Sequence, residues 1–286
     1  MAILAVATGR PDAPSDFGNR RSGAMQRALW RLADDRRFGP LTRARLRMLV
    51  GRLAPGPFDI EAEAIRLRAY PAENHSDRVA VARGRLPDRD ERAAIAPYLP
   101  EGGVFVDVGA NVGLYSLWAA LRVGPSGTVL AIEPHPQTAE RLAFNIAANG
   151  LANVRLLTTG IGAVAGTARL HSSAGGNVGQ SSLLEDVAFR PDGAYEIAVH
   201  PLLTAIREAG LTHLDVLKVD VEGYEDRVIV PFLRDAPQTL LPRAVLVETD
   251  VAGCWASDCL AALQARGYDA VLNTAANAVL ARTGPA

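Results

Sequence analysis

Residues 104–113, VFVDVGANVG, constrain the fold more than any other stretch of this sequence. The run from 104 to 108 is apolar except for Asp107. A run of this kind, without polar alternation, predicts a strand that is buried on both faces of a parallel sheet. A turn with Gly109, Asn111 and Gly113 follows at once, and LYSLWAALR after it has the apolar spacing of a helix. Strand, glycine-rich turn and helix form the unit in which backbone N–H groups meet a ligand.

The chain after this unit alternates predicted strands with predicted helices, which is the pattern of a doubly wound α/β fold with a mainly parallel sheet. Apolar runs predict further strands at residues 128–132, 154–157, 215–220, 243–249, 268–272 and 278–282. Apolar spacing predicts helices at residues 137–148, 202–209 and 257–266, and another that ends near residue 233. Short strands are expected around Gly160, Gly162 and Gly166, and the polar stretch 172–183 is predicted as a loop.

The chain is predicted to consist of an N-terminal extension, residues 1–100, and a ligand-binding domain, residues 101–286. Charge supports this division. Residues 1–52 contain eleven arginines and four acids, hence a net charge of +7, whereas the remaining residues carry −8. Segments 58–70 and 78–81 are predicted as the strands of a lead-in hairpin, and a short helix should follow before the first sheet strand.

The extension is also predicted to contain two basic amphipathic helices. Met25, Leu29 and Leu32 recur at helical spacing, and residues 41–53 repeat the pattern, with arginines between the apolar positions. Such a helix makes peripheral contact with an anionic membrane, binds a partner, or packs on its own domain, and these alternatives stay open. Nucleic-acid binding is not expected, because the aromatic residues that stack on bases are scarce here.

The composition predicts a globular protein of the cytoplasm. Hydrophobic residues make up 49% of the chain and charged residues 21%. No apolar run reaches the roughly 18 to 20 residues of a membrane span, and the opening MAILAVATG lacks the basic start of a signal peptide. Cys254 and Cys259 have no cysteine framework around them, so reduced thiols are expected.

The glycine-rich turn lacks the pattern that binds a dinucleotide. The offsets of G-x-G-x-x-G fall on Gly109, Asn111 and Leu114, so two of the three glycines are missing. Asp107, at the carboxyl end of its strand, is expected to point toward the ligand crevice, where a carboxylate repels a pyrophosphate. It suits a ligand with a cationic amino group, and S-adenosylmethionine offers an ammonium and a sulfonium without a phosphate.

An acid at the end of the second predicted strand completes this interpretation. Glu133 lies 24 residues after Gly109 and is followed by Pro134. In doubly wound folds an acidic side chain at this place accepts hydrogen bonds from ribose hydroxyls. The candidate cofactor-binding residues are therefore Asp107, Gly109, Asn111, Gly113, Glu133 and Pro134.

The chain contains, in this order, VFVDVGANVGLYSLWAA, AIEPHPQTAERLAFNIAANGLANV, GQSSL and LDVLKVDVEGYE. With these blocks the sequence resembles the FkbM-type S-adenosylmethionine-dependent methyltransferases over residues 86–250. The resemblance implies a class I methyltransferase fold, which is a Rossmann-like sheet of seven strands with the last one antiparallel. It also implies O-methylation of the hydroxyls of sugars or natural products.

The candidate catalytic residues are Asp220, Lys218 and Glu222, which alternate along the end of the predicted strand 215–220. At period two they share one face, directed at the ligand if the strand continues to Glu222. Asp220 is the preferred general base, with Lys218 pairing with it or polarising the acceptor oxygen. The alternatives are a purely structural ion pair, or Mg²⁺ held by the two carboxylates, although spacing supplies no third ligand. No His/Cys spacing forms a zinc site.

The sequence thus predicts an S-adenosylmethionine-dependent O-methyltransferase. Its expected acceptor is a hydroxyl of a carbohydrate, or of a glycosylated or natural-product metabolite. One rival is a nicotinamide-dependent oxidoreductase, disfavoured by the missing glycines. The other is a non-catalytic module that binds the cofactor or a partner through its basic arm.

Overall fold

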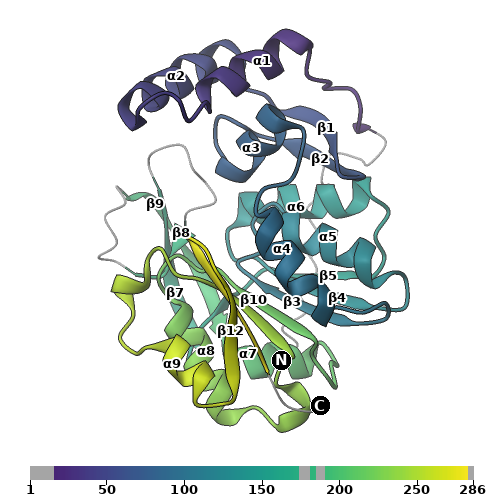
Figure 1. Cartoon of the computed structure of the whole chain (residues 1–286), viewed down its shortest axis with the longest axis vertical. Helices are drawn as coiled ribbons and strands as arrows, with labels where there is room; N and C mark the ends of the chain where they lie inside the picture. The colour runs from purple at the N-terminus through teal and green to yellow at the C-terminus, as the bar shows by residue number, and fades with distance from the viewer. Residues whose placement is uncertain (1–15, 174–180, 185–190, 283–286) are drawn as a thin grey trace.

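The computed structural model describes residues 16–173, 181–184 and 191–282. At its centre is a seven-stranded sheet of order β12-β13-β11-β10-β3-β4-β5 (Figure 1). The strands are β3 (Val104–Val108), β4 (Thr128–Ile132), β5 (Val154–Leu157), β10 (Val216–Val219), β11 (Ala244–Glu248), β12 (Tyr268–Asn273) and β13 (Asn277–Arg282). β13 runs antiparallel to both of its neighbours, β11 and β12, and the other strand pairs of this sheet are parallel. The predicted α/β fold with seven strands, the last antiparallel, is confirmed.

Helices cover both faces of this sheet, and strand alternation decides which side chains they bury. Phe105 of β3 packs with α4 (Arg89–Ile95) and α5 (Leu114–Val123), and Ala131 of β4 packs with α6 (Pro136–Ala148) on the same face. Val106 packs on the opposite face, with three other helices. Those helices are α7 (Leu202–Glu208), α8 (Glu225–Asp235) and α9 (Cys259–Gln264). Because both faces are covered, every residue of β3 is buried, as its apolar run predicted.

The first described helices and the hairpin of the predicted N-terminal extension form a segment, residues 24–83, that makes up the upper part of the molecule in Figure 1. It contains α1 (Ala24–Ala33), α2 (Pro40–Leu53), the hairpin β1 (Phe58–Ala62) and β2 (Ile65–Ala69), and α3 (His75–Arg83). The hairpin therefore lies wholly within 58–70, and the strand predicted at 78–81 is wrong, because these residues belong to α3. Asn74 caps this helix by accepting a hydrogen bond from Asp77 N (3.1 Å), and Gly84 ends it in the left-handed conformation.

The hairpin is bound to the sheet domain through α6. Asn145 Oδ1 accepts a hydrogen bond from Arg68 N (2.9 Å), while Asn145 Nδ2 donates to Val112 O (3.0 Å). One buried side chain of α6 thus connects β2 to the turn that follows β3. Arg68 also lies over the ring of Phe144 and forms a buried ion pair with Asp59 at 2.8 Å. The division at residue 100 stays a prediction, but the two parts contact each other closely.

The first two helices are present as predicted, but only some of their apolar residues pack inward and several face outward. Met25 and Leu32 are exposed, whereas Trp30 is buried and donates a hydrogen bond to Ala54 O (3.0 Å). Seven of the eleven large hydrophobic side chains exposed in the described residues belong to this part of the chain: Met25, Leu32, Phe38, Leu41, Met48, Leu49 and Leu53. No helix among the described residues is long and apolar enough to cross a membrane. Peripheral membrane contact through this face stays a prediction.

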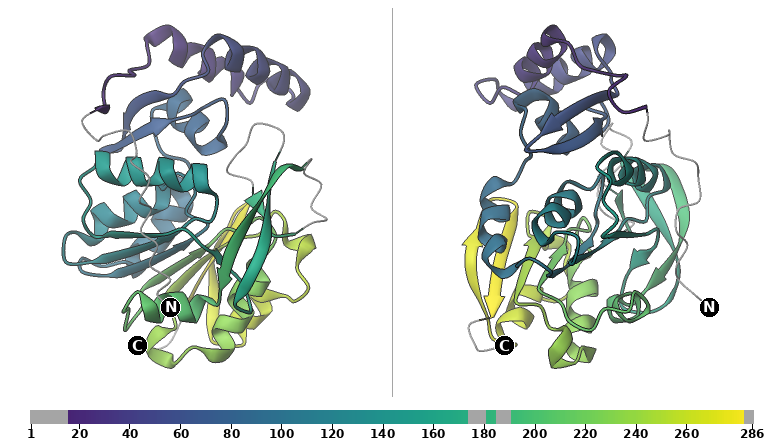
Figure 2. Two further views of the ribbon diagram at one scale, coloured as in Figure 1. Left: turned by 180° about the vertical axis from the view of Figure 1, so that it is seen from behind. Right: turned by 90° about the vertical axis from the view of Figure 1, so that its right-hand side faces the viewer.

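A second, four-stranded sheet of order β6-β9-β7-β8 stands beside the ends of the central strands (Figure 2). Its strands are β6 (Gly160–Ile161), β7 (Gly166–Ser173), β8 (Ser181–Ser182) and β9 (Pro191–His200). The loop predicted at 172–183 is thus partly strand, and its residues 174–180 lie outside the described residues. This sheet places Leu170, Ser181 and Leu183 at one wall of the central cavity.

Candidate active site

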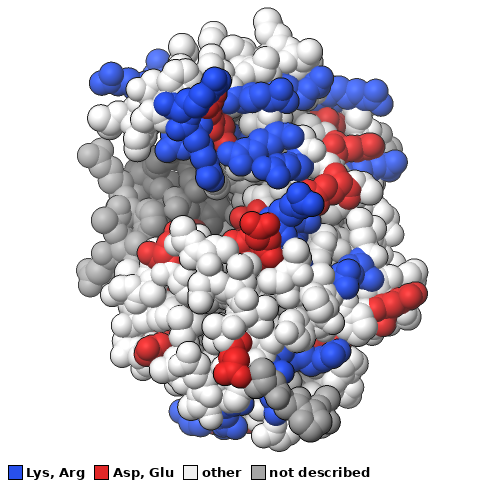
Figure 3. All heavy atoms as spheres, in the orientation of Figure 1, with Lys and Arg blue, Asp and Glu red and all other residues white. Residues whose placement is uncertain are grey.

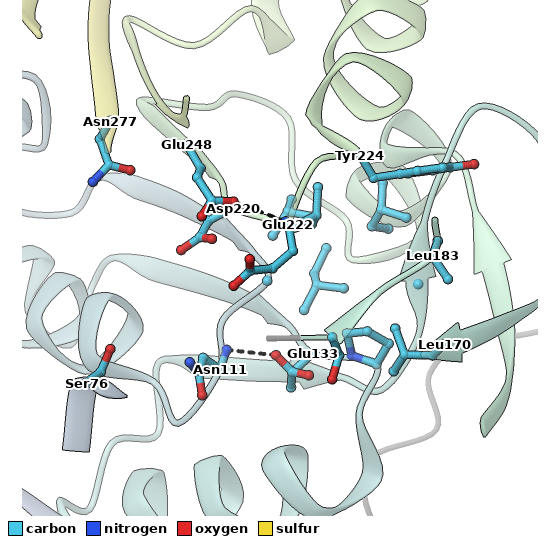
Figure 4. A pocket seen from close by; sticks show the side chains of 18 of the residues that line it. Ser76, Asn111, Glu133, Leu170, Leu183, Asp220, Glu222, Tyr224, Glu248 and Asn277 are labelled. Atoms are coloured by element: carbon cyan, nitrogen blue, oxygen red, sulfur yellow. Dashed lines mark hydrogen bonds between the residues drawn. The ribbon is translucent and has the colours of Figure 1, made fainter. Parts of the chain in front are cut away.

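A cavity of about 310 Å³ opens at the carboxyl ends of the central strands, where open α/β sheets bind their ligands (Figure 4). Glu133 and Pro134, after β4, line it together with Asp220 and Glu222, which follow β10. Glu248, the last residue of β11, faces the same space. The carboxyl ends of β4, β10 and β11 thus bring together acids that lie far apart along the chain, Glu133 and Glu248 being 115 residues apart.

The glycines of the turn after β3 are required by packing as well as by backbone conformation. Gly109 has φ +77°, and a Cβ there would lie 1.8 Å from the backbone oxygen of Asp220. Gly113 has φ +94°, and a Cβ there would lie 2.3 Å from Leu142 Cδ1. Gly109 therefore allows the ends of β3 and β10 to approach each other, and Gly113 allows α6 to pack against the start of α5.

Asp107 lies beneath the cavity and is fully buried. Its Oδ1 is 3.1 Å from Lys218 Nζ, and its Oδ2 accepts a hydrogen bond from Ser116 Oγ (2.6 Å). Asp107 meets Lys218 because the register of the parallel strands β3 and β10 pairs these two residues. Asp107 is not among the described residues that line the main cavity, although the sequence predicted that it points into the crevice. These contacts suit Asp107 to position Lys218.

Lys218 ties the two strand ends together. Its Nζ donates a hydrogen bond to Gly109 O (2.9 Å) and also lies 3.2 Å from Asp220 Oδ2. The side chain is only 4% exposed. Burial lowers the pKa of Lys218, but the charges of Asp107 and then Asp220 outweigh burial and leave this pKa above its ordinary value. Lys218 therefore stays cationic, and the predicted pairing with Asp220 is present.

Glu133 holds the turn after β3 and also faces the cavity. Its Oε2 accepts a hydrogen bond from Asn111 N (2.8 Å), and its Oε1 accepts one from His135 N (2.9 Å). Asn111 itself has φ +52°, and its Oδ1 accepts a hydrogen bond from Asn74 Nδ2 of the extension (2.8 Å). Glu133 is 6% exposed, and burial raises its pKa to about 7, although the two backbone hydrogen bonds lower it. Each oxygen retains a lone pair for a ligand hydroxyl.

Three carboxylates gather at the other end of the cavity. Oxygens of Asp220, Glu222 and Glu248 lie within 4.8 Å of one another. The strand ends at Val219, so Glu222 reaches this cluster from a turn in which its own φ is +55°, rather than by strand alternation. Burial, followed by the charge of Asp220, raises the pKa of Glu222 to about 9, and the same two causes raise the pKa of Glu248 to about 12. Asp220 alone has Lys218 as its counter-ion in the described structure.

Several residues of the site were missed in the sequence. Glu248 has a detectable signal, because it is an acid near the carboxyl end of the predicted strand 243–249. His75, Ser76 and Asp88 line the same cavity from the extension, and nothing in their spacing indicates this role. The extension therefore forms part of the site itself.

Comparison with known proteins identifies the family of this chain. A family model described as the methyltransferase FkbM domain matches residues 107–268. The chain belongs to the FkbM methyltransferase family. Methyltransferase sdnD of Sordaria araneosa is 31% identical to this FkbM methyltransferase over an alignment of 198 residues, and the match covers 60% of this chain and 75% of that relative. The resemblance carried by the sequence blocks is confirmed.

Two solved structures have a low level of similarity to the FkbM methyltransferase. The O-methyltransferase TomG from Streptomyces achromogenes, solved in complex with S-adenosylmethionine, is 15% identical with a TM-score of 0.42, and 70% of this chain and 84% of that chain are covered. Precorrin-6y C5,15-methyltransferase from Geobacter metallireducens is 15% identical with a TM-score of 0.41, and 68% and 88% are covered. Neither protein informs on residue roles in the FkbM methyltransferase at this level of similarity.

Proposed function

We propose that this FkbM methyltransferase transfers a methyl group from S-adenosylmethionine to a hydroxyl of a carbohydrate, or of a glycosylated or natural-product metabolite. The observation that carries the proposal is the division of the cavity. Glu133 faces it at the end of β4, and the three-carboxylate cluster of Asp220, Glu222 and Glu248 faces it at the ends of β10 and β11. One end suits a ribose, and the other suits a hydroxyl that must lose a proton.

The residues present fit S-adenosylmethionine. Glu133 has lone pairs left for the two ribose hydroxyls, and a carboxylate–diol contact is charge-assisted. Ile132, Ile161 and Leu170 offer an apolar wall for the adenine. When bound, S-adenosylmethionine supplies an electrophilic methyl group on a sulfonium.

The protein contributes positioning and a proton acceptor. Holding the acceptor oxygen in line with the methyl carbon and the sulfur supplies roughly 7 to 11 kcal/mol. Asp220 is the residue best suited to accept the hydroxyl proton, because it lines the cavity and Lys218 fixes its orientation. Glu222 and Glu248 have raised pKa values and are suited to remain protonated near neutral pH, where they donate hydrogen bonds.

The carboxylate cluster is also close enough to bind one divalent cation through oxygen ligands, with Glu248 as the third ligand that spacing did not reveal. Magnesium dependence stays an alternative. The transfer assay decides it when run with added Mg²⁺ and with a chelator. Because Lys218 already balances charge at Asp220, we expect the rate to be the same in both conditions.

The proposal is tested by mass spectrometry after incubation with a methyl-labelled donor and a panel of sugars, glycosides and natural products. We expect a gain of one labelled methyl group on an oxygen of at least one acceptor class. Calorimetry should show binding of S-adenosylhomocysteine and none of NAD. Binding of NAD alone would indicate the oxidoreductase, and binding of S-adenosylhomocysteine without transfer to any acceptor would indicate a binding module.

Affinity for S-adenosylhomocysteine should depend on the ionisation of Glu133. Because the ionised carboxylate accepts the ribose hydroxyls and its pKa is about 7, affinity should fall about tenfold between about pH 8 and pH 6. Fold stability should respond in the opposite direction. A carboxyl whose pKa is raised by folding contributes most below its ordinary pKa of 4.5, and this contribution is lost as the pH rises toward 7. Calorimetry between about pH 4.5 and about pH 8 measures both the affinity for S-adenosylhomocysteine and the stability of the fold. Glu133→Gln is the control and should remove the pH dependence of both quantities. An unchanged response in Glu133→Gln would assign it to another group.

A further inference from the structure

A second cavity, of about 370 Å³, lies in the N-terminal extension and is here called the basic groove. It is bounded by α2, the end of α3 and the segment that leads into α4. Six arginines line it: Arg36, Arg43, Arg47, Arg83, Arg85 and Arg89. Figure 3 shows basic side chains gathered over the upper part of the molecule, above a hollow whose lower edge carries acidic side chains.

The arginines of the basic groove are only partly neutralised by the protein. Asp34 pairs with Arg47 Nη2 at 2.7 Å and with Arg83 Nη2 at 3.1 Å. The other four arginines of the groove form no ion pair within the described residues. The Nε atoms of Arg43 and Arg47 are buried and have no hydrogen-bond partner there. Guanidinium groups that lack a partner for their N–H groups can donate hydrogen bonds to a bound anion.

The acids that also line the groove do not complete this neutralisation. They are Asp34, Asp88, Asp90 and Glu91, four acids against six arginines. Glu91 accepts a hydrogen bond from Thr274 Oγ1 (2.9 Å) of the sheet domain. The net charge of the groove lining is therefore positive.

The crowding of positive charge contributes to lowered pKa values of neighbouring groups. Arg78, whose Nε lies 3.8 Å from Asp34 Oδ1, has its pKa lowered to about 10 by burial and then by Arg47. Burial, followed by Arg78, lowers the pKa of His75 to about 4, so this imidazole is neutral at pH 7. A bound anion would relieve this repulsion.

The basic groove adjoins the active-site cavity. His75 and Asp88 line both cavities, and Ser76 follows on the active-site side. A molecule with an anionic group in the groove therefore has its remaining part directed at Asp220 and the cofactor site. An anion that takes no part in the reaction would not need a groove that joins the active-site cavity.

We propose that the basic groove binds the phosphate group of the methyl acceptor, which is therefore a phosphorylated or nucleotide-linked small molecule. The inference rests on the proposed methyl transfer in the adjoining cavity. Arginine suits this task because its planar fork donates two parallel hydrogen bonds to phosphate oxygens, and every cation that lines the groove is an arginine.

Calorimetry with inorganic pyrophosphate tests the proposal on the full chain at low salt. The test variant is Arg43→Gln with Arg85→Gln, because both side chains line the groove and neither forms an ion pair in the described structure. The matched control is Arg45→Gln with Arg52→Gln, which removes two exposed arginines of α2 outside the groove. We expect pyrophosphate to bind the wild type and the control equally, and the test variant at least about tenfold more weakly.

Binding of S-adenosylhomocysteine, measured in the same samples, separates this proposal from the proposed function. We expect it to be equal in all three proteins and unchanged by saturating pyrophosphate. Absence of pyrophosphate binding, or equal losses in the test and control variants, overturns the acceptor proposal and leaves methyl transfer standing. Absence of S-adenosylhomocysteine binding in the wild type overturns the proposed function instead.

Phosphate also occurs in lipid headgroups, and vesicles distinguish that source. We expect binding to phosphatidylglycerol vesicles to be the same in the test variant and the matched control, because the groove is reserved for a soluble acceptor. If the test variant alone loses vesicle binding, the groove recognises a headgroup and the acceptor proposal is overturned.

Discussion

We expect Asp107→Ala to destabilise the protein by about 3 to 5 kcal/mol and to weaken cofactor binding severely, because it leaves a buried cation without its buried counter-ion. Lys218 is 4% exposed and would retain as its counter-ion only Asp220, a partly exposed carboxylate, beside its hydrogen bond to Gly109 O. The hydroxyl of Ser116 would also lose its acceptor. Denaturant unfolding measures the stability, and calorimetry with S-adenosylhomocysteine at low temperature measures the binding of the folded fraction.

Two further variants sharpen this test. Asp235→Ala removes an acid from an exposed ion pair with Arg234 and should leave the stability close to that of the wild type. Asp107→Leu combined with Lys218→Met leaves no unpaired buried charge and should recover much of the lost stability without restoring binding. If Asp107→Ala has wild-type stability and yet binds no cofactor, Asp107 contacts the cofactor directly and its positioning role is wrong.

We expect Asp220→Asn to slow methyl transfer by about 10² to 10⁴-fold while S-adenosylhomocysteine affinity changes little. The amide occupies the same volume and still hydrogen-bonds, but it cannot accept the hydroxyl proton at neutral pH. Single-turnover kinetics with a responsive acceptor isolates the chemical step. The exposed Asp235→Asn, which makes the same change of charge, is the control and should leave the rate unaltered.

The neighbouring acids decide whether Asp220 alone has this role. Glu222→Gln and Glu248→Gln remove acids with raised pKa values, so each should slow transfer less than Asp220→Asn. A larger loss in either variant than in Asp220→Asn would assign proton transfer to that glutamate.

Local patterns predicted the elements of the central sheet because their information lies within a few residues. The apolar run of β3 and the αL glycines that follow it need no knowledge of distant residues. The strand predicted at 78–81 failed for the opposite reason. Alternating Val79 and Val81 suit a strand, but the residues from Val79 to Ala82 are all buried in α3, where packing on every side overrides alternation.

The sequence predicted the residues of the candidate site better than it predicted the contacts between them. Glu133, Asp220 and Glu222 line the cavity, as acids near the carboxyl ends of parallel strands should. Asp107 does not, because strand register pairs it with Lys218 beneath the surface of the cavity. Glu248 joins the cluster because β11 lies beside β10, and strand order cannot be read from spacing.

The sequence by itself determined the fold class, the family resemblance and the excess of arginine in the extension, because each depends on residue types and short spacings. The tertiary structure decided where those features meet. It placed Asp107 against Lys218, brought Glu248 to Asp220, and laid the basic groove beside the active-site cavity through His75 and Asp88. These relations join residues far apart along the chain, and only the packing of helices and strands in three dimensions sets such distances.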